Sequence, residues 1–297
     1  MHEHASALGG SGRVVSPGRA VALRILARDP VGVVGVALIV TVLLAGVLGP
    51  ELAPFDPAAL HVRDRLAPPG PTYWLGTDEL GRDLLTRVLY GARVSLQVGI
   101  VAVMSASVAG VSLGMVAGYK GRHLDSVIMR IMDMIFAFPT ILLALVLAAV
   151  LGTDLKNLSL AIAIVYVPMF ARIARGSTMV IAAQPYIEAA RSVGAHGSRV
   201  LLRHILPNIA APLTVQFTVS LAYAILVEAS LSFLGLGVQP PMASWGAMLS
   251  TGKVYMELSL WPTLVPGIAI MLTVLGFNLL GDGMRDALDP RLRTRGG

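Results

Sequence analysis

The chain has 297 residues, of which 55% are apolar and only 13% are charged. With a mean hydropathy of +0.75, this composition excludes an ordinary soluble domain and predicts a protein that crosses a membrane several times. The net charge of +6 is explained by basic side chains beside anionic headgroups, so we expect membrane lipids and no nucleic acid as partners. The absence of cysteine excludes disulfides, thiol catalysis and Cys-ligated metals.

Apolar runs predict six membrane-spanning helices. Residues 1–20 lack apolar periodicity, and we assign residues 1–24 to an N-terminal tail without fixed structure. A further run, 157–171, is short but ends at Arg172, whose side chain can reach the headgroups, so we count it as a span. The other runs reach the roughly 20 residues that cross a bilayer, and they cover 31–50, 94–119, 134–153, 205–227 and 258–281. The expected fold class is an all-α polytopic membrane protein.

The segment after the first span carries most of the basic residues that we expect on the outer side of the membrane. We assign residues 25–60 to the first span with its flanks and residues 61–93 to an external segment. Within it, residues 77–90 combine acidic and basic side chains with leucines and valine. This pattern predicts an amphipathic helix lying on the outer membrane surface.

Small residues recur every four positions in the second predicted span. Such a ridge lets another helix approach closely and pack by dispersion. The neighbouring helix can belong to this chain or to another subunit, and the sequence leaves both open. The ridge consists of Ala102, Ala106, Gly110, Gly114 and Gly118.

Charged residues inside the predicted spans are few. Arg130 and Asp133 are three residues apart, which predicts an ion pair within one helix. Glu228 has no charged neighbour in sequence, and we expect it to face a polar translocation pathway or a partner subunit. The alternatives are a buried, hydrogen-bonded carboxyl or one exposed at the outer interface. Glycines and prolines in residues 229–252 predict a loop or re-entrant segment.

A polar loop, residues 184–208, separates two apolar stretches. Pro185 suits a first helical turn and Gly194 a helix end, so we predict a short helix over residues 185–193. A second helix is expected to begin near Ser198, with an apolar and a basic side, and Pro207 is expected to mark the start of the next span. The two short helices would form a compact projection.

Basic residues predict the orientation. With the N-terminus inside, 16 of the 23 Lys and Arg residues fall on the cytoplasmic side. Both termini, the 184–208 loop and a C-terminal tail, residues 282–297, are therefore expected in the cytoplasm, and Asp282 and Arg285 are expected to end the last span.

The sequence predicts no catalytic residue, no metal site and no cofactor bound by this chain. The sole Gly-Lys pair, Gly252-Lys253, is followed by Val254, so the phosphate-binding loop of an ATPase is missing. The histidines are scattered without metal-ligand spacing.

The 184–208 loop resembles the EAA loop of permease subunits in ATP-binding cassette (ABC) importers. Further stretches narrow the resemblance to the C-type permeases of dipeptide and oligopeptide importers: Ala53-Pro54-Phe55-Asp56-Pro57, Trp74 to Asp78, Leu231 to Gly237, and Gly281 to Arg291. By this resemblance, the residues that couple to an ATPase are Tyr186, Glu188, Ala189, Ala190, Arg191, Gly194, His204, Leu206 and Pro207. Many EAA loops have an aliphatic residue where His204 stands.

The resemblance implies a type I ABC importer permease of the MetI-like fold, with a five-span core over residues 94–281, in a bacterial inner membrane. It implies a homologous B-type permease, two ATPase subunits that bind ATP and Mg²⁺, and an extracytoplasmic solute-binding protein as partners. The chain itself would not be an enzyme. Nickel, glutathione or heme as cargo remains an alternative to peptides, and a secondary transporter driven by an ion gradient is the rival from another class.

Overall fold

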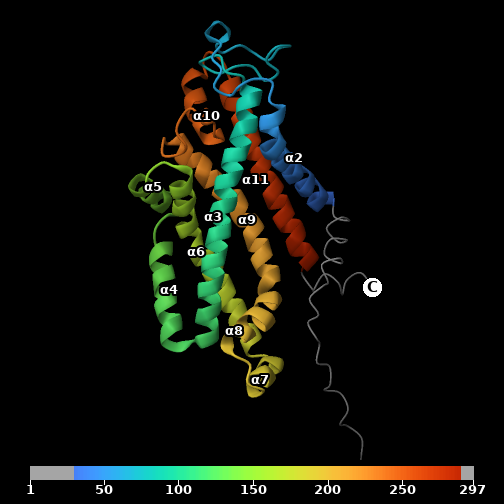
Figure 1. Cartoon of the computed structure of the whole chain (residues 1–297), viewed down its shortest axis with the longest axis vertical. Coiled ribbons are helices and arrows are strands. Elements are labelled where there is room, and N and C mark those ends of the chain that lie inside the picture. Colours follow the sequence, from blue (N-terminus) through green and yellow to red (C-terminus); the bar gives the residue numbers. More distant parts are fainter. Residues whose placement is uncertain (1–29, 289–297) are drawn as a thin grey trace, which may run out of the picture.

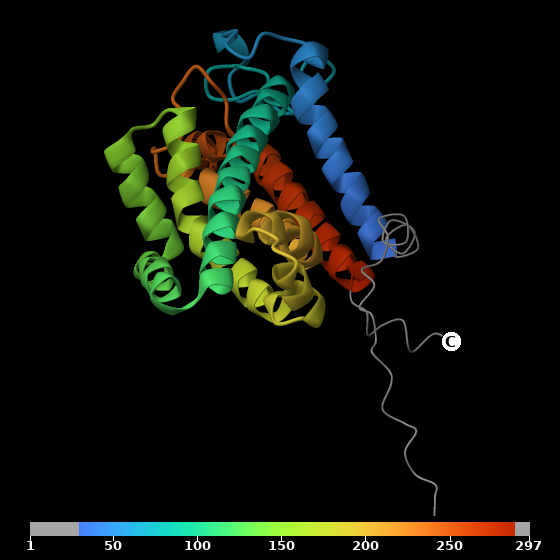
Figure 2. The same cartoon turned by 60° about the horizontal axis from the view of Figure 1, so that its bottom comes forward.

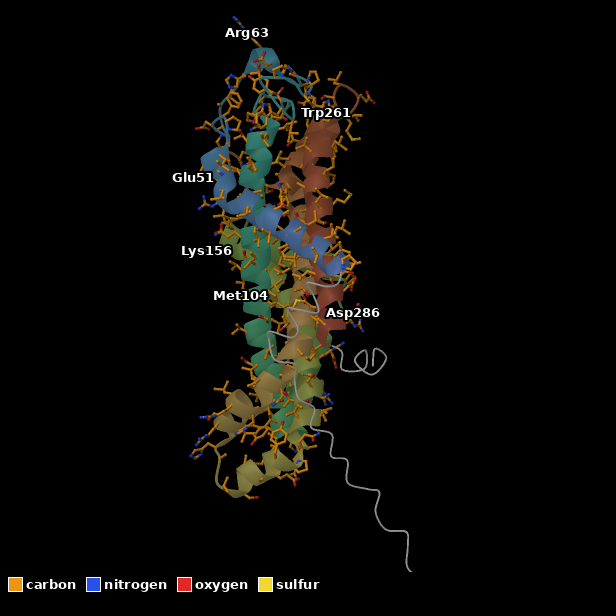
Figure 3. The ribbon with its side chains drawn as sticks, turned by 90° about the vertical axis from the view of Figure 1, so that its right-hand side faces the viewer. Glu51, Arg63, Met104, Lys156, Trp261 and Asp286 are labelled. Atoms are coloured by element: carbon orange, nitrogen blue, oxygen red, sulfur yellow. The ribbon has the colours of Figure 1, made fainter. Side chains whose placement is uncertain are left out.

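A computed structural model describes residues 30–288, and every regular element in that range is a helix. The molecule is elongated (Figure 1). One end carries α7 and α8 and is called the α7 end; the other carries α10 with the irregular residues 53–83 and is called the α10 end. In Figure 3, Arg63 lies at the tip of the α10 end. The tail predictions for residues 1–24, and for residues 289–297, lie outside the described range.

Within residues 30–288, five helices are long and apolar enough to cross a membrane. The first, α2, crosses α3 and α11 obliquely (Figure 3). The third of them, α6, contains the short run 157–171 as part of 28 residues, which confirms it as a span. These helices are α2 (Pro30–Leu52), α3 (Leu84–Lys120), α6 (Leu155–Ala182), the helix Gly197–Phe233 that ends as α9, and α11 (Trp261–Leu288).

The predicted continuous span over residues 134–153 is wrong. Two helices, α4 (Arg122–Phe136) and α5 (Thr140–Leu151), meet there at 90° and count as a sixth span only if they cross together. Pro139 explains the break, because it has no N–H for the helix and disfavours helical backbone at Phe138. In Figure 2, α5 lies beside α6 while α4 is viewed nearly end-on.

The predicted amphipathic helix over residues 77–90 is also wrong. Thr77 and Asp83 form an isolated β-bridge, and α3 begins only at Leu84. The Asp83 carboxylate caps α3 by accepting a hydrogen bond from the Thr86 N–H at 2.8 Å, an interaction worth about 1 kcal/mol. Charges in this stretch pair with one another, since Arg82 Nε lies 2.6 Å from Asp78 Oδ2. These paired charges stabilise a compact turn over residues 77–83, whereas residues 84–90 belong to α3 and lengthen the second span.

Residues 53–83 are packed into an ordered cap. Rings of Phe55 and Tyr73 lie 5.4 Å apart, and the Tyr73 hydroxyl donates to Asp64 at 3.1 Å. Burial, and then the hydrogen bond to Asp64, raise the pKa of the Tyr73 phenol above its usual 10.0. The buried Arg87 of α3 ties the cap to the bundle by donating to the Pro57 carbonyl at 3.1 Å.

The small-residue ridge of α3 packs against α6 of the same chain. A Cβ on Gly114 would lie 2.2 Å from the Ala171 carbonyl oxygen, and one on Gly110 would lie 2.5 Å from that of Val167. A Cβ on Gly118 would likewise lie 2.7 Å from the Arg175 carbonyl oxygen, and Ala102 and Ala106 are fully buried. Of the two partners that the sequence allowed, the structure selects the intramolecular one.

Ion pairs hold α4 against α6. Asp133 pairs with Arg172 of α6 at 2.7 Å, so the predicted pair with Arg130 is wrong. Asp125 accepts two hydrogen bonds from Arg175, one of them at 2.6 Å. Because i, i+3 spacing was the only geometric information in the sequence, the partner on another helix could not be inferred.

The loop or re-entrant segment predicted for residues 229–252 is only partly a loop: residues 234–244 are irregular, whereas residues 229–233 complete α9 and residues 245–252, which include Gly246, form a helix. Gly235 turns the chain with φ +87°, and α10 (Trp245–Gly252) follows. The Trp245 indole donates to the Val88 carbonyl of α3 at 3.0 Å. Residues 234–252 are called the α10 segment below.

Candidate functional site

The helix predicted over residues 185–193 is present as α7 (Pro185–Ser192). Pro185 occupies its first turn, and Gly194 ends it with φ +84°. The Gly194 N–H donates to the Arg191 carbonyl at 2.9 Å and the Ala195 N–H to the Ala190 carbonyl at 3.1 Å, so the glycine allows the chain to close the helix end and reverse. No atom lies within 4 Å of a Cβ placed on Gly194.

The second predicted helix begins at Gly197, but it does not end before the next span. α8 (Gly197–Arg199), a π-helical turn (Val200–Ile205) and α9 (Leu206–Phe233) form one continuous helix of 37 residues. The Leu206 N–H donates to the carbonyl of Leu201, five residues back, and Pro207 needs no such bond. The π turn accommodates Pro207 in the first turn of α9, so the predicted start of the next span at Pro207 agrees with the structure to one residue, although the helix is continuous with the preceding turn.

A small apolar core supports this loop. Ile187 of α7 and Val200, Ile205 and Ile209 of the following helix are buried with Met115 of α3. Ile187 is thus the one fully buried side chain of α7, and most of its other side chains are exposed. This core makes the loop a rigid extension of α3 and α9.

Tyr119, at the end of α3, contacts both halves of the loop. The Arg191 guanidinium lies 4.6 Å from the centre of its ring, and a Cβ on Gly197 would lie 3.3 Å from the ring edge. Sequence reasoning missed Tyr119, because nothing in its neighbours along the chain points to a loop some 70 residues away.

Figure 1 shows α7 and α8 projecting at the α7 end of the bundle. The Glu188 carboxylate makes no hydrogen bond or ion pair with the described residues 30–288. Most of the loop residues singled out by sequence are exposed, namely Tyr186, Glu188, Ala189, Arg191, Gly194 and Pro207, whereas Ala190, His204 and Leu206 are half-buried. The arrangement presents a free carboxylate and an exposed aromatic ring on a rigid helix.

Glu228 does not lie on this surface or on any other. Its side chain is fully buried inside the chain, and its Oε1 accepts a hydrogen bond from the Ser232 hydroxyl at 2.7 Å. The expectation that it faces a pathway or a partner subunit is therefore corrected to the alternative of a buried, hydrogen-bonded carboxyl. The sequence could not show that the α10 segment covers it.

A mostly apolar groove of about 430 Å³ adjoins the loop. It lies between α3, α6 and the beginning of α9, and its lining includes Val111, Phe170, Leu202 and Leu213. Leu202 and Leu206 belong to both the groove and the π-turn region, so any movement of the loop changes the groove. Among residues 30–288 no cluster of His, Asp and Glu could hold a metal ion.

The fold and the site define a polytopic helical membrane protein with one protruding, rigid two-helix loop. The family model of the binding-protein-dependent transport system inner membrane component matches residues 110–294, and the model of the N-terminal TM domain of oligopeptide transport permease C matches residues 16–69. The chain belongs to this family of transport-system inner membrane components.

Similar proteins agree with this assignment. The dipeptide transport system permease protein DppC of Alkalihalophilus pseudofirmus is 45% identical over 280 residues, 94% of this chain and 92% of the relative. The glutathione transport system permease protein GsiD of Pectobacterium atrosepticum is 47% identical over 244 residues, 82% and 81% of the two chains. The probable D,D-dipeptide transport system permease protein DdpC of Escherichia coli is 44% identical over 266 residues, 90% and 89%. The resemblance to C-type permeases of ABC importers is confirmed, and the chain is a multi-pass inner-membrane protein.

Proposed function

We propose that this chain is the C-type permease subunit of an ABC importer that takes up dipeptides or oligopeptides. The observation that carries the proposal is the exposed α7 loop, which is continuous with a membrane-spanning helix. The names of two relatives, which refer to dipeptides, support the cargo class. Because another relative is a glutathione permease, glutathione is the second candidate, and it is chemically a short peptide as well.

Coupling to ATP follows from the rigidity of the loop. The exposed face of α7, with Tyr186 and Glu188, would dock into a cleft of an ATPase subunit, and ATP binding would shift that cleft. A docked helix can transmit no more free energy than the difference between its binding free energies to the two states of the ATPase. The helix Gly197–Phe233 would carry the shift along the bundle and change the adjoining groove.

The partners follow from the same role. We infer one homologous B-type permease that completes the pathway, two ATPase subunits that bind ATP and Mg²⁺, and a solute-binding protein on the other side, all in a lipid membrane. The α7 end would then face the cytoplasm, together with both termini. This orientation requires α4 and α5 to cross the membrane together, because five crossings would place the termini on opposite sides.

The test is purification of the chain from its native membrane together with whatever binds it, followed by reconstitution. Co-purifying ATPase subunits and ATP-dependent uptake of a labelled dipeptide, stimulated by the solute-binding protein, are the expected results. Uptake that follows an ion gradient without ATPase subunits would refute the function. Uptake of glutathione but not of other di- or tripeptides would keep the importer and replace the cargo.

A further inference from the structure

Glu228 lies at the centre of a buried polar cluster contributed by three parts of the fold. Ser232 of α9 donates to its Oε1 at 2.7 Å, and Ser95 of α3 and Ser244 at the start of α10 lie close enough to interact with the same carboxyl. All three serines are buried. Buried polar groups stabilise a fold only when they are hydrogen-bonded to one another, and a connected cluster then favours one arrangement of its elements.

The α10 segment passes very close to α9 on both sides of this carboxyl. A Cβ on Gly246 would lie 2.2 Å from the Ala229 carbonyl oxygen, and one on Gly237 would lie 1.9 Å from the Ser232 hydroxyl. Farther along, the Ser250 hydroxyl donates to the Phe233 carbonyl at 2.7 Å. The segment is thus seated on the last two turns of α9, with Glu228 beneath it.

The cluster works by hydrogen bonding rather than by attraction between opposite charges. No Lys, Arg or His of residues 30–288 forms an ion pair with Glu228. One carboxyl oxygen, Oε2, and the Ser95 hydroxyl are both buried without a partner of normal geometry, so each is available to the other after a small adjustment. A neutral amide of the same shape could serve the same neighbours.

α9 links this cluster to the loop at the other end of the molecule. The helix runs without interruption from Gly197, beside α7, to Phe233, beside the α10 segment. Figure 1 shows the two ends of this helix at opposite ends of the bundle. A displacement of the loop therefore reaches the residues around Glu228 through one continuous helix.

We propose that Glu228, oriented by Ser232 of its own helix, is a positioning residue that fastens the α10 segment to α9 and α3 through hydrogen bonds with Ser244 and Ser95. Movement of α9 then carries the α10 segment with it. The fastening is independent of the proposed function, whereas the transmission of movement from the α7 loop rests on it.

The first experiment measures fastening by cysteine labelling, which the cysteine-free chain permits. Met248 of α10 is buried and Val193 is 86% exposed, so Met248→Cys serves as the probe and Val193→Cys as the reference for maleimide labelling of the purified transporter complex. Each cysteine is combined in turn with a change at the cluster. The ratio of the two labelling rates reports local opening of the α10 segment.

The cluster variants are Glu228→Gln, Glu228→Leu and Ser244→Gly, with Ser230→Ala as the control; glycine is chosen because it is tolerated at the N-cap of α10. Ser230 lies on the same helix as Glu228, but its hydroxyl donates only to the backbone of that helix, at Leu226. We expect Met248→Cys to label roughly tenfold faster with Glu228→Leu and several-fold faster with Ser244→Gly, since buried partners lose hydrogen bonds. Glu228→Gln and Ser230→Ala should leave the rate unchanged.

Equal labelling in Ser244→Gly and Ser230→Ala would overturn the fastening role, and this pair decides even if Glu228→Leu fails to accumulate. A rate in Glu228→Gln as high as in Glu228→Leu would overturn the hydrogen-bonding role.

The second readout is the change in labelling when the ATPases are trapped with nucleotide. This change should persist in Glu228→Gln and vanish in Ser244→Gly while ATP hydrolysis continues. No change in the unaltered chain would overturn the transmission alone.

Discussion

Gly194 and Tyr119 determine the shape of the α7 loop at the level of single residues. Gly194 adopts a left-handed backbone that costs other residues roughly 1–2 kcal/mol, with Asn and Asp the most tolerant. Since the space around its Cβ position is open, a side chain there would project toward a docking partner and not into the chain. Tyr119 fixes the loop from the side of α3 through Arg191.

Gly194→Asp should leave the chain in the membrane but abolish peptide uptake and stimulated ATP hydrolysis. The new carboxylate would lie at the C-terminal end of α7, where the helix dipole disfavours negative charge, and on the surface that we expect to dock. Gly194→Asn has the same shape without the charge and should keep most of the activity. Normal uptake by the aspartate variant would refute the coupling role of the loop.

Tyr119→Leu should lower transport-coupled ATP hydrolysis several-fold, because it removes a cation–π contact worth about 0.5–1 kcal/mol and the ring that supports Gly197. Tyr119→Phe keeps the ring and is expected to behave like the unaltered protein. The measurement is the rate of peptide-stimulated ATP hydrolysis in proteoliposomes. If the two variants hydrolyse ATP at equal rates, Tyr119 has no positioning role.

At the scale of elements, close contact between α3 and α6 organises the bundle. The ridge glycines let the two backbones touch, and the ion pairs of Asp125 and Asp133 then attach α4 to α6. Without a hydrophobic driving force between helices in lipid, such close packing is a main source of their association. The glycines of the ridge are therefore expected to tolerate less change than glycines elsewhere on the same helices.

Gly114→Ala should destabilise the protein by about 1–3 kcal/mol, since its Cβ would overlap the Ala171 carbonyl of α6. Gly176→Ala is the matched control: it also lies within a spanning helix, but no atom lies within 4 Å of its Cβ position. The control should be neutral or slightly stabilising, because alanine favours helix by up to about 1 kcal/mol. The measurement is thermal unfolding in detergent, and equal behaviour of the two variants would contradict the packing argument.

On the scale of the whole molecule, the bend between α4 and α5 decides the topology. The described residues contain five uninterrupted candidate spans, and the sixth depends on a pair of helices that meet at 90°. If the pair crosses the membrane, the turn at Thr153 lies on the side of Arg63 and Val193 lies on the opposite side. If it does not, Thr153 lies opposite Arg63, and Val193, which follows the α6 crossing, lies on the side of Arg63.

Thr153→Cys should therefore react with an impermeant maleimide from the same side as Arg63→Cys, and Val193→Cys only from the opposite side. All three positions are at least partly exposed. Labelling is compared in intact spheroplasts and in inverted vesicles. Reaction of Val193→Cys from the same side as Arg63→Cys, with Thr153→Cys reacting only from the opposite side, would establish five crossings and place the termini on opposite sides.

The sequence by itself determined the class of the protein, the apolar stretches that become spans, and the short helix that ends at Gly194. The composition, the lengths of the apolar runs and the positions of the glycines carry this information, because spans and helix ends depend on local backbone chemistry and on the surrounding solvent. Only the tertiary structure decided that Asp133 pairs with Arg172, that residues 77–83 fold into a capped turn, and that Glu228 lies beneath the α10 segment. Each of these depends on residues distant in sequence, whose approach is set by helix packing and not by spacing along the chain.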